Sequence, residues 1–440
     1  MSDFVAVIGG GLAGCECAFR LARAGIPVRL FEMKPKRYSE AHTSPDLAEL
    51  VCSNSLRSDE PATAVGLLKE EMRALGSLIL AAAAATRVPA GKALAVDRAL
   101  FARFVTRAIE SEPDIELVRA EVESLDSLLL AGAAAVVVAA GPLAGESLAA
   151  SLAGAIGSER LYFYDAIAPI VDAASIDMSR VFFGSRWRPE DDDYLNCPLS
   201  EQEYGRFVEA LLAADQVAPR PFEKQVHFEG CLPVEEMAAR GPMTLAFGPL
   251  KPVGLVDPRT KARPFAVVQL RPENRERTAY NLVGFQTRLA HPEQKRVFRM
   301  IPGLEQAEFL RLGSIHRNTY VNAPQVLSER LELFARPGVY LAGQITGVEG
   351  YVESAACGLW LGLALAARLG PGVVLPPPPP ETALGALLGH LRAEAANFQP
   401  SNVHFGLMPG LGRVRKRERK ERYAERARTA FAAWLRSLPG

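Results

Sequence analysis

The chain has 440 residues, of which 49% are hydrophobic and 23% are charged, as in globular proteins with two or three domains. Its formal net charge is +0, so any polyanionic partner must meet a local basic patch. The six cysteines show no disulfide-scaffold spacing, and Cys15 and Cys17 have no zinc-ligand partners nearby. We therefore expect a reducing cytoplasmic environment and no metal. Because the chain opens on a predicted core strand, we expect neither a signal peptide nor a membrane span.

The first 32 residues contain a glycine-rich turn in a strand–helix–strand context, over residues 4–8, 12–24 and 28–31. Gly9 allows a tight turn, Gly11 lets a pyrophosphate approach the backbone, and Gly14 lets the helix pack closely on the strand. The helix N-terminus attracts phosphates, and Glu32 is placed to bind a ribose. The alternative is an ordinary βαβ unit whose glycines serve packing only. The pattern favours a dinucleotide site made by Gly9, Gly10, Gly11, Leu12, Ala13, Gly14 and Glu32.

The same alternation of helices and strands continues to about residue 160. Apolar spacing predicts a helix over 62–80, and Asp97 caps a second helix that runs through residue 108. Strands follow over 114–122 and 135–139. A βαβ series of this kind predicts a parallel sheet covered by helices.

From residue 161 the sequence becomes richer in proline, arginine and aromatic residues, with short strands predicted over 181–183, 265–270 and 279–285. The first pattern returns with a strand over 339–342 and a helix over 354–369, and a charged helical tail is predicted over 381–438. The fold class is therefore α/β, a split Rossmann-like domain with an inserted α+β domain and a helical tail. The expected parts are 1–160, 161–325, 326–375 and 376–440.

The segment over residues 339–369, in which the chain re-enters the first domain, also indicates which cofactor is bound. A strand ending at residue 342 precedes glycine-spaced residues 343–350 and a helix, so backbone N–H groups can reach the middle of a long dinucleotide. A plain strand and helix is the alternative. Taken with the N-terminal turn, the segment favours FAD, bound in part by Gly343, Gln344, Gly350 and Tyr351.

Long irregular motifs identify a resemblance over nearly the whole chain. They include GGGLAGCECA at 9–18, ELVCSNSLRS at 49–58, FEGCLPVEEMAARG at 228–241, GPLKPVGL at 248–255, HRNTYVNAP at 316–324 and LAGQITGVEGYVESAACG at 341–358. The chain resembles the folate- and FAD-dependent tRNA (uracil-5-)-methyltransferases (the TrmFO family). It is more distantly similar to the MnmG/GidA flavoproteins, which act on wobble uridines.

The resemblance implies an activity. Methylenetetrahydrofolate would supply a carbon, reduced FAD would supply electrons, and NADPH or NADH would reduce the flavin. The product would be 5-methyluridine at position 54 in the T-loop of tRNA. The alternatives are a generic FAD-dependent oxidoreductase and a flavin-bound tRNA-binding protein without essential turnover. The oligomeric state stays open.

Two cysteines are the candidate catalytic residues. Addition of a thiolate to C6 of uracil makes C5 nucleophilic, and Cys52 and Cys231 both lie in polar turn sequences. Our hypothesis is that Cys231 attacks C6 while Cys52 removes the C5 proton or protects the intermediate, and the opposite assignment stays open. Each could instead be a small buried hydrophobic residue.

Folate must stack on the flavin, which requires an aromatic residue and polar partners. Tyr351 follows the 343–350 turn, and His316, Arg317 and Asn318 could bind the pterin or the glutamate tail. The alternatives are a helix-capping tyrosine and ordinary loop residues. Asp97 and Arg98 are expected to order the fold near the adenine half of the cofactor.

A basic segment is the candidate tRNA surface, because binding and extruding a uridine requires cationic contacts. Residues 413–428 contain nine Lys or Arg against three Glu. A solvated helix face with Glu–Arg pairs is the alternative. The predicted contacts are Arg413, Arg415, Lys416, Arg417, Arg419 and Lys420, with Arg186, Trp187 and Arg188 as a smaller second candidate.

Overall fold

A five-stranded parallel sheet forms the base of the molecule's larger domain. The computed structural model describes residues 4–157, 161–186, 191–217, 232–394, 398–415 and 417–438, with only the backbone described over 161–167 and 315–318. The sheet has the order β16-β7-β1-β2-β6, and all its neighbouring pairs are parallel. Its strands are β1 (Phe4–Ile8), β2 (Val28–Phe31), β6 (Ile115–Val118), β7 (Ala133–Val138) and β16 (Val339–Leu341).

The sheet confirms the predicted split α/β fold, because its edge strand comes from the far end of the chain. In β16, Leu341 pairs with Val138 of β7, which in turn pairs with Ile8 of β1. Four of the strands lie close to the predicted ranges. The strand predicted over 114–122 is shorter, because β6 ends at Val118 beside the end of β2, and residues 120–122 instead line a cleft. The four-part division of the chain stays a prediction.

Helices cover the sheet, and two of them cross at backbone contact. They are α1 (Leu12–Ala22), α4 (Arg98–Glu110), α5 (Glu146–Ile156) and α11 (Tyr351–Leu369). A Cβ atom on Gly358 of α11 would lie 2.1 Å from the Ala13 carbonyl oxygen of α1, so only glycine allows this crossing. Among the described residues, α11 alone is long and apolar enough to cross a membrane, and 78% of its 18-residue apolar window is buried inside the protein. Its composition is therefore that of a core helix.

The single helix predicted over 62–80 is two helices, α2 (Ala64–Ala74) and α3 (Leu78–Ala85). Gly76 takes a left-handed conformation with φ of +77°, which ends the first helix, and Ser77 then caps the second. Glu16 of α1 accepts hydrogen bonds from the free N–H groups of Leu78 and Ile79 at 3.2 and 3.0 Å. A partner 62 residues away in sequence thus stabilises the new helix start, which local periodicity does not reveal.

A six-stranded antiparallel sheet forms the inserted domain, with the order β10-β11-β12-β13-β9-β14. Its strands are β9 (Ile170–Asp172), β10 (Phe182–Phe183), β11 (Leu195–Leu199), β12 (Ala266–Pro272), β13 (Ala279–Leu282) and β14 (Phe309–Arg311). Phe207, Phe285 and Phe298 fill the core between this sheet and helices α6 (Glu201–Leu212) and α9 (His291–Phe298). The remaining short helices of this region are α7 (Val234–Ala239) and α8 (Thr244–Phe247), whereas α10 (Ala323–Val326) packs in the core of the first domain.

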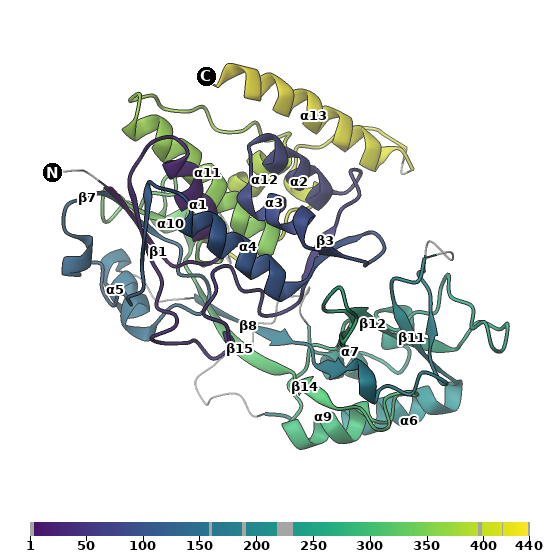
Figure 1. Ribbon diagram of the computed structural model, residues 1–440. Helices are drawn as coiled ribbons and strands as arrows, with labels where there is room; N and C mark the ends of the chain where they lie inside the picture. The colour runs from purple at the N-terminus through teal and green to yellow at the C-terminus, as the bar shows by residue number, and fades with distance from the viewer. Residues whose placement is uncertain are drawn as a thin grey trace.

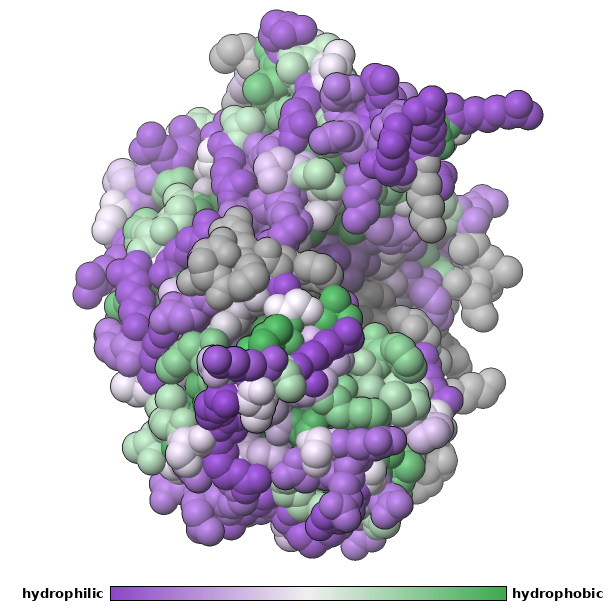
Figure 2. Space-filling view, turned by 90° about the vertical axis from the view of Figure 1, so that its right-hand side faces the viewer, coloured by the Kyte–Doolittle hydropathy of each residue, from purple (hydrophilic) through white to green (hydrophobic). Residues whose placement is uncertain are grey.

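The two domains are joined by an antiparallel ribbon of β8 (Leu161–Ile167) and β15 (Ser314–Tyr320). Figure 1 shows this ribbon between the helix-covered domain above and the inserted domain at lower right. In the face shown in Figure 2, hydrophilic side chains dominate the upper part and hydrophobic ones gather in the lower part, which belongs to the inserted domain. A three-stranded sheet of β3 (Ser55–Ser58), β5 (Ala93–Val96) and β4 (Arg87–Val88) completes the strands.

The tail is helical only in part. It contains α12 (Ala383–His390) and α13 (Arg419–Ser437), and α13 lies across the top of Figure 1. Between them the described residues form only a short 3₁₀ turn, at Phe405–Leu407. Gly406, Gly410 and Gly412 interrupt helical propensity there, so the prediction of a helical tail over 381–438 was too long. Trp434 anchors α13 by packing on Trp360 of α11.

Candidate functional site

A cleft opens where the parallel strands end, the place where α/β sheets bind their ligands. Segments that follow β1, β2, β6, β7 and β16 line it, together with the start of α11. Gly9 has a φ of +109°, and a Cβ atom there would lie 2.6 Å from the Ala139 carbonyl oxygen. Gly14 lies beneath this turn, where a Cβ atom would lie 1.9 Å from the Gly9 carbonyl oxygen. Both glycines therefore bring backbone segments together, as predicted for the turn.

Gly11 sits at the start of α1 and faces open space. No side chain caps this helix, so its first N–H groups are free to bind a ligand. A Cβ atom on Gly11 would meet nothing within 4 Å, which leaves room for a group that approaches the backbone. A helix start of this kind, in a cleft lined by Gly9, Gly10, Gly11, Leu12 and Ala13, fits the pyrophosphate of a dinucleotide.

Glu32 lies at the end of β2 and lines the same cleft. Its two carboxylate oxygens accept hydrogen bonds from the backbone N–H groups of Gly10 and Lys34, both at 2.9 Å. A carboxylate oxygen has two lone pairs, so each still has capacity for a ribose hydroxyl. The geometry supports the predicted ribose contact.

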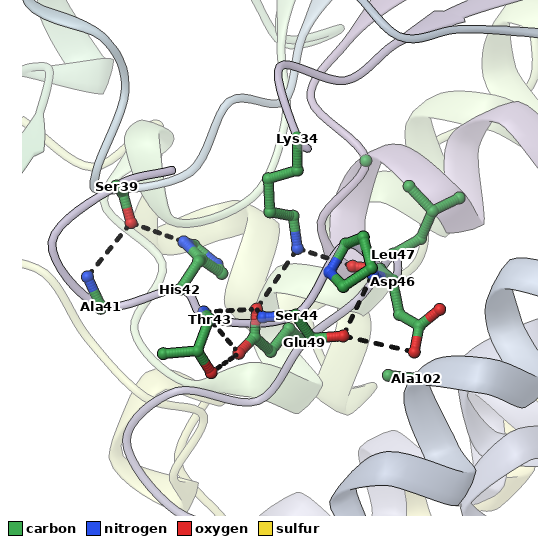
Figure 3. A network of polar contacts seen from close by, with 12 residues as sticks. Lys34, Ser39, Ala41, His42, Thr43, Ser44, Asp46, Leu47, Glu49 and Ala102 are labelled. Carbon is green, nitrogen blue, oxygen red and sulfur yellow. Dashed lines mark hydrogen bonds and ion pairs between the residues drawn. The ribbon is translucent and has the colours of Figure 1, made fainter. Parts of the chain in front are cut away.

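A polar network that the sequence did not predict supports this end of the cleft (Figure 3). The buried Lys34 ammonium donates to the Asp46 carbonyl oxygen at 2.6 Å and lies 3.4 Å from the Glu49 carboxylate. Burial raises the pKa of Glu49, but hydrogen bonds from Thr43 and the Lys34 charge outweigh it, so the pKa is lowered overall. Glu49 therefore stays ionised and holds the loop between β2 and Cys52 in place.

The other end of the cleft is formed by the 343–351 turn. Gly343 has a φ of +80°, and the Gln344 amide donates to Glu349 at 2.7 Å. Gly343, Gln344 and Tyr351 line the cleft, whereas Gly350 is not among the lining residues. Gly350, with a φ of +107°, instead provides the backbone turn that begins α11.

Tyr351 connects this turn to the predicted catalytic loop. Its hydroxyl oxygen accepts hydrogen bonds from the backbone N–H groups of Cys52 and Ser53 at 2.7 and 3.3 Å. Burial raises the pKa of the Tyr351 hydroxyl, which keeps it protonated. Cys52 is half-buried, and its neighbour Val51 lines the cleft. The structure thus brings Cys52 and Tyr351 together beside the cofactor cleft.

Three arginines surround the Cys52 loop, and sequence reasoning missed all three as a group. Arg98 donates to the Leu50 carbonyl oxygen at 2.6 Å, Arg311 donates to the Val51 carbonyl oxygen at 2.9 Å, and Arg271 donates to the Ser53 hydroxyl at 3.1 Å. They come from α4, β14 and β12, so no local pattern could have grouped them. Their guanidinium groups contact the residues on either side of Cys52 and gather positive charge at this loop.

Arg98 was expected to act near the adenine half of the cofactor, and that expectation was wrong. It contacts the Cys52 loop and makes a two-bond ion pair with Glu273 of the inserted domain. Burial lowers the pKa of Arg98, but the Glu273 carboxylate outweighs it, so the pKa is raised. Burial lowers the pKa of Arg271 and Arg311. Arg98 therefore ties the two domains together at the candidate catalytic loop.

Several predicted residues can be placed only in part. Cys231 lies outside the residues that the structure describes. His316, Arg317 and Asn318 lie on β15, where their backbone pairs with β8. The structure describes only the backbone of these three residues. The next residue, Thr319, donates its backbone N–H to the carbonyl oxygen of Pro142, which lines the cleft. The β15 backbone therefore reaches the edge of the cleft.

The basic segment 413–420 is exposed, but it is not one helix face. Arg413, Arg415 and Arg417 precede α13, Arg419 and Lys420 begin it, and Lys416 lies outside the described residues. Arg415 and Arg417 lie 3.8 and 3.5 Å from Glu418, so part of the charge is paired. Of the second basic candidate, Arg186 donates to the Pro249 carbonyl oxygen at 3.0 Å, and Trp187 and Arg188 lie outside the described residues.

Comparisons with known proteins agree with this architecture. The family model described as "Glucose inhibited division protein A" (GIDA) matches residues 4–370. The methylenetetrahydrofolate–tRNA-(uracil-5-)-methyltransferase TrmFO of Oleidesulfovibrio alaskensis is 64% identical over 435 residues, which cover 99% of this chain and 97% of that protein. The protein of the same name from Geobacter sulfurreducens is 60% identical over 441 residues and covers 100% of both chains.

Solved structures agree on the fold. The crystal structure of Aquifex aeolicus GidA in form II superposes with a TM-score of 0.68 at 18% identity, and the match covers 98% of this chain and 74% of that chain. The form I crystal gives a TM-score of 0.67. At this identity the likeness establishes the fold alone.

Proposed function

The chain belongs to the glucose inhibited division protein A family and, within it, to the TrmFO group, and we propose that it methylates C5 of a tRNA uridine with methylenetetrahydrofolate as carbon donor. Family membership supports the reaction class. One observation in the structure carries the assignment of the site: Tyr351, a lining residue of the dinucleotide cleft, holds the backbone of Cys52 at 2.7 Å. A reactive thiol beside such a cleft is what a uracil-modifying flavoenzyme requires.

The cleft residues fit FAD, which would supply the reducing equivalents for the methyl group when bound. Gly11 and the start of α1 would hold its pyrophosphate, and Glu32 would hold a ribose. Gly343, Gln344 and Tyr351 would border the isoalloxazine. In the proposed enzyme, NADPH or NADH reduces the flavin and the protein acts in the cytoplasm.

The chain's own residues would activate the uracil. A thiolate adds to C6, which makes C5 an enolate-like nucleophile, and the C5 proton leaves after the new carbon bond forms. Cys231 is proposed to attack C6 while Cys52 removes the proton or protects the intermediate, and the reverse assignment is the alternative. The cations of Arg98, Arg271 and Arg311 favour negative charge beside Cys52, whichever role it takes.

The proposed substrate contacts follow the same geometry. Tyr351 would stack on the folate, with His316, Arg317 and Asn318 binding its pterin or glutamate. Their support is the backbone bond from Thr319 to Pro142 at the cleft edge. The exposed Arg413, Arg415, Arg417, Arg419 and Lys420, with Lys416, are proposed to contact tRNA near the T-loop uridine at position 54.

Modification of tRNA by the purified FAD-bound protein tests the activity. Unmodified tRNA, methylenetetrahydrofolate and NADPH together should give 5-methyluridine, and omission of any one should abolish it. Turnover of NADPH without a tRNA product would instead identify a generic oxidoreductase. tRNA binding without product would identify a flavin-bound RNA-binding protein.

The cysteine roles require a separate experiment. RNA with 5-fluorouridine at the target position traps a thiolate adduct at C6. Loss of the adduct in Cys231→Ala, with retention in Cys52→Ala, would support our assignment, and the reverse pattern would exchange the roles. Cys197→Ala is the matched control, because Cys197 is buried in the inserted domain. Trapping by both single variants would show that neither is the nucleophile.

A further inference from the structure

A second groove, separate from the cofactor cleft, lies along α4 where the end of α3 and the segment after β12 meet it. Its lining includes Arg103 and Arg107 of α4, Arg275 of the inserted domain, and the ring of Phe104. Among the described residues that line it, none is acidic. The groove therefore gathers three positive charges on a chain whose formal net charge is +0.

The three arginines differ from the ion-paired arginines on the surface of this protein. Arg29 and Arg37 lie 2.7 and 2.5 Å from glutamates. In the part of the chain that the structure describes, Arg103, Arg107 and Arg275 have no ion-pair partner. The Arg275 guanidinium donates to the Ala85 carbonyl oxygen, which holds it at the groove wall with donors to spare. Positive charge in a concave, unneutralised place points to an anionic ligand.

The favourable effect of cations on helix C-termini explains only part of this pattern. Arg107 lies in the last turn of α4, where a positive charge stabilises the helix dipole. Arg103 lies a full turn earlier, and Arg275 comes from another domain. Phe104, which lines the same groove, is 37% accessible, although apolar side chains usually face the core.

The groove and the candidate catalytic loop are contacted by the same two segments, α4 and the chain that follows β12. Arg98, which begins α4, contacts the carbonyl oxygens of Leu50 and Val51 beside Cys52. Its ion-pair partner Glu273 lies two residues before Arg275. At 1.5 Å per residue, Arg103 and Arg107 lie roughly 7 and 14 Å along the helix from Arg98. Neighbouring residues of α4 thus line the groove and contact the Cys52 loop.

We propose that this groove binds the sugar–phosphate backbone of the tRNA substrate next to the target uridine, an inference that rests on the function proposed above. Guanidinium groups bind phosphate oxygens through paired N–H donors. Arg103 and Arg107 are one helical turn apart, about 6 Å, and reach neighbouring positions along a strand. The Phe104 ring, which lines the same groove, offers a face on which a base or sugar packs.

Salt-dependent binding of fluorescently labelled, unmodified tRNA tests the groove. We compare the FAD-bound wild-type protein with Arg103→Gln/Arg107→Gln. The variant should bind about tenfold more weakly near 0.1 M salt, and its plot of log affinity against log salt should be shallower by about two, one for each lost phosphate contact. The slope for the single variant Arg275→Gln should be shallower than that of the wild type by about one. The matched control, Arg23→Gln/Arg330→Gln, removes two exposed charges outside the groove and should bind as the wild type does.

Flavin absorbance and NADPH-dependent flavin reduction without tRNA should be equal in all these proteins, which separates a binding defect from a folding defect. A groove variant that matches the control variant in affinity and salt slope would overturn the proposal while leaving the proposed function intact. A raised KM for polyglutamylated folate with unchanged tRNA affinity would also overturn it, by assigning the arginines to carboxylates. Failure of the wild-type protein to bind tRNA would overturn this inference and the proposed function together.

Discussion

Replacement of Tyr351 by phenylalanine isolates one hydroxyl group at the candidate active site. The ring that lines the cleft remains, but the backbone N–H groups of Cys52 and Ser53 lose the acceptor that they contact at 2.7 and 3.3 Å. An unsatisfied, partly buried N–H group costs about 1–3 kcal/mol, and relaxation of the loop recovers part of this by moving Cys52. Displacement that costs 1.4 kcal/mol in the transition state lowers the rate about tenfold.

We therefore expect Tyr351→Phe to lower kcat about tenfold or more while KM for tRNA and the amount of bound FAD stay near the wild-type values. Alkylation of Cys52 by iodoacetamide should also change in rate. Tyr204→Phe is the matched control, because its hydroxyl accepts from the Ala246 N–H at 3.2 Å in the inserted domain. The control should lose stability without losing kcat. Wild-type kcat and alkylation rate in Tyr351→Phe would refute the positioning role.

Three further predictions concern stability. Gly358→Ala should lower Tm and FAD content, because its Cβ would lie 2.1 Å from α1 backbone, whereas Gly389→Ala, with nothing within 4 Å, should be neutral or stabilising. Burial raises the pKa of Glu71 to about 7 from 4.5, so its contribution to stability is full below pH 4.5 and is lost as pH rises through 7. The Tm of Glu71→Gln relative to that of the wild type should accordingly rise as the pH increases from 4.5 to 7. A difference in Tm that does not change with pH would contradict this. Urea unfolding of Arg57→Gln should show a loss of about 2 kcal/mol or more, because the buried Glu353 carboxylate loses the cation that it contacts at 2.6 Å and keeps the Val403 N–H, and a loss below 0.5 kcal/mol would contradict it.

Local sequence patterns were enough to predict the sheet and the glycine turn. Strands β1 and β2 and the turn between them are specified by contiguous residues, and the glycines have no substitute at their close contacts. The return of the chain in β16 followed from a second strand–turn–helix pattern. The predictions that failed concern features that depend on residues far apart in sequence. The break at Gly76 was invisible to periodicity because Glu16, on another helix, supports the new helix start.

The candidate site shows the same division. Cys52 and Tyr351 were found singly, but their contact through the Tyr351 hydroxyl joins residues 299 positions apart. Arg98, Arg271 and Arg311 converge on one loop only after two domains are assembled, so each looks like an ordinary arginine in sequence. Charge counting found the 413–428 segment and left Glu–Arg pairing open as the alternative, and the structure shows such pairing at Glu418.

The late position of β16 in the chain has a consequence for synthesis on the ribosome. By the time residue 311 has been made, every strand of the six-stranded sheet exists, yet the parallel sheet still lacks the edge strand at 339–341. The face of α1 that α11 covers stays open for longer still, since α11 ends at Leu369. Domains fold as units once their sequence has emerged. The inserted domain, encoded in the middle of the gene, is thus the first to be complete. The domain that opens the chain keeps an exposed apolar surface until β16 and α11 have been made.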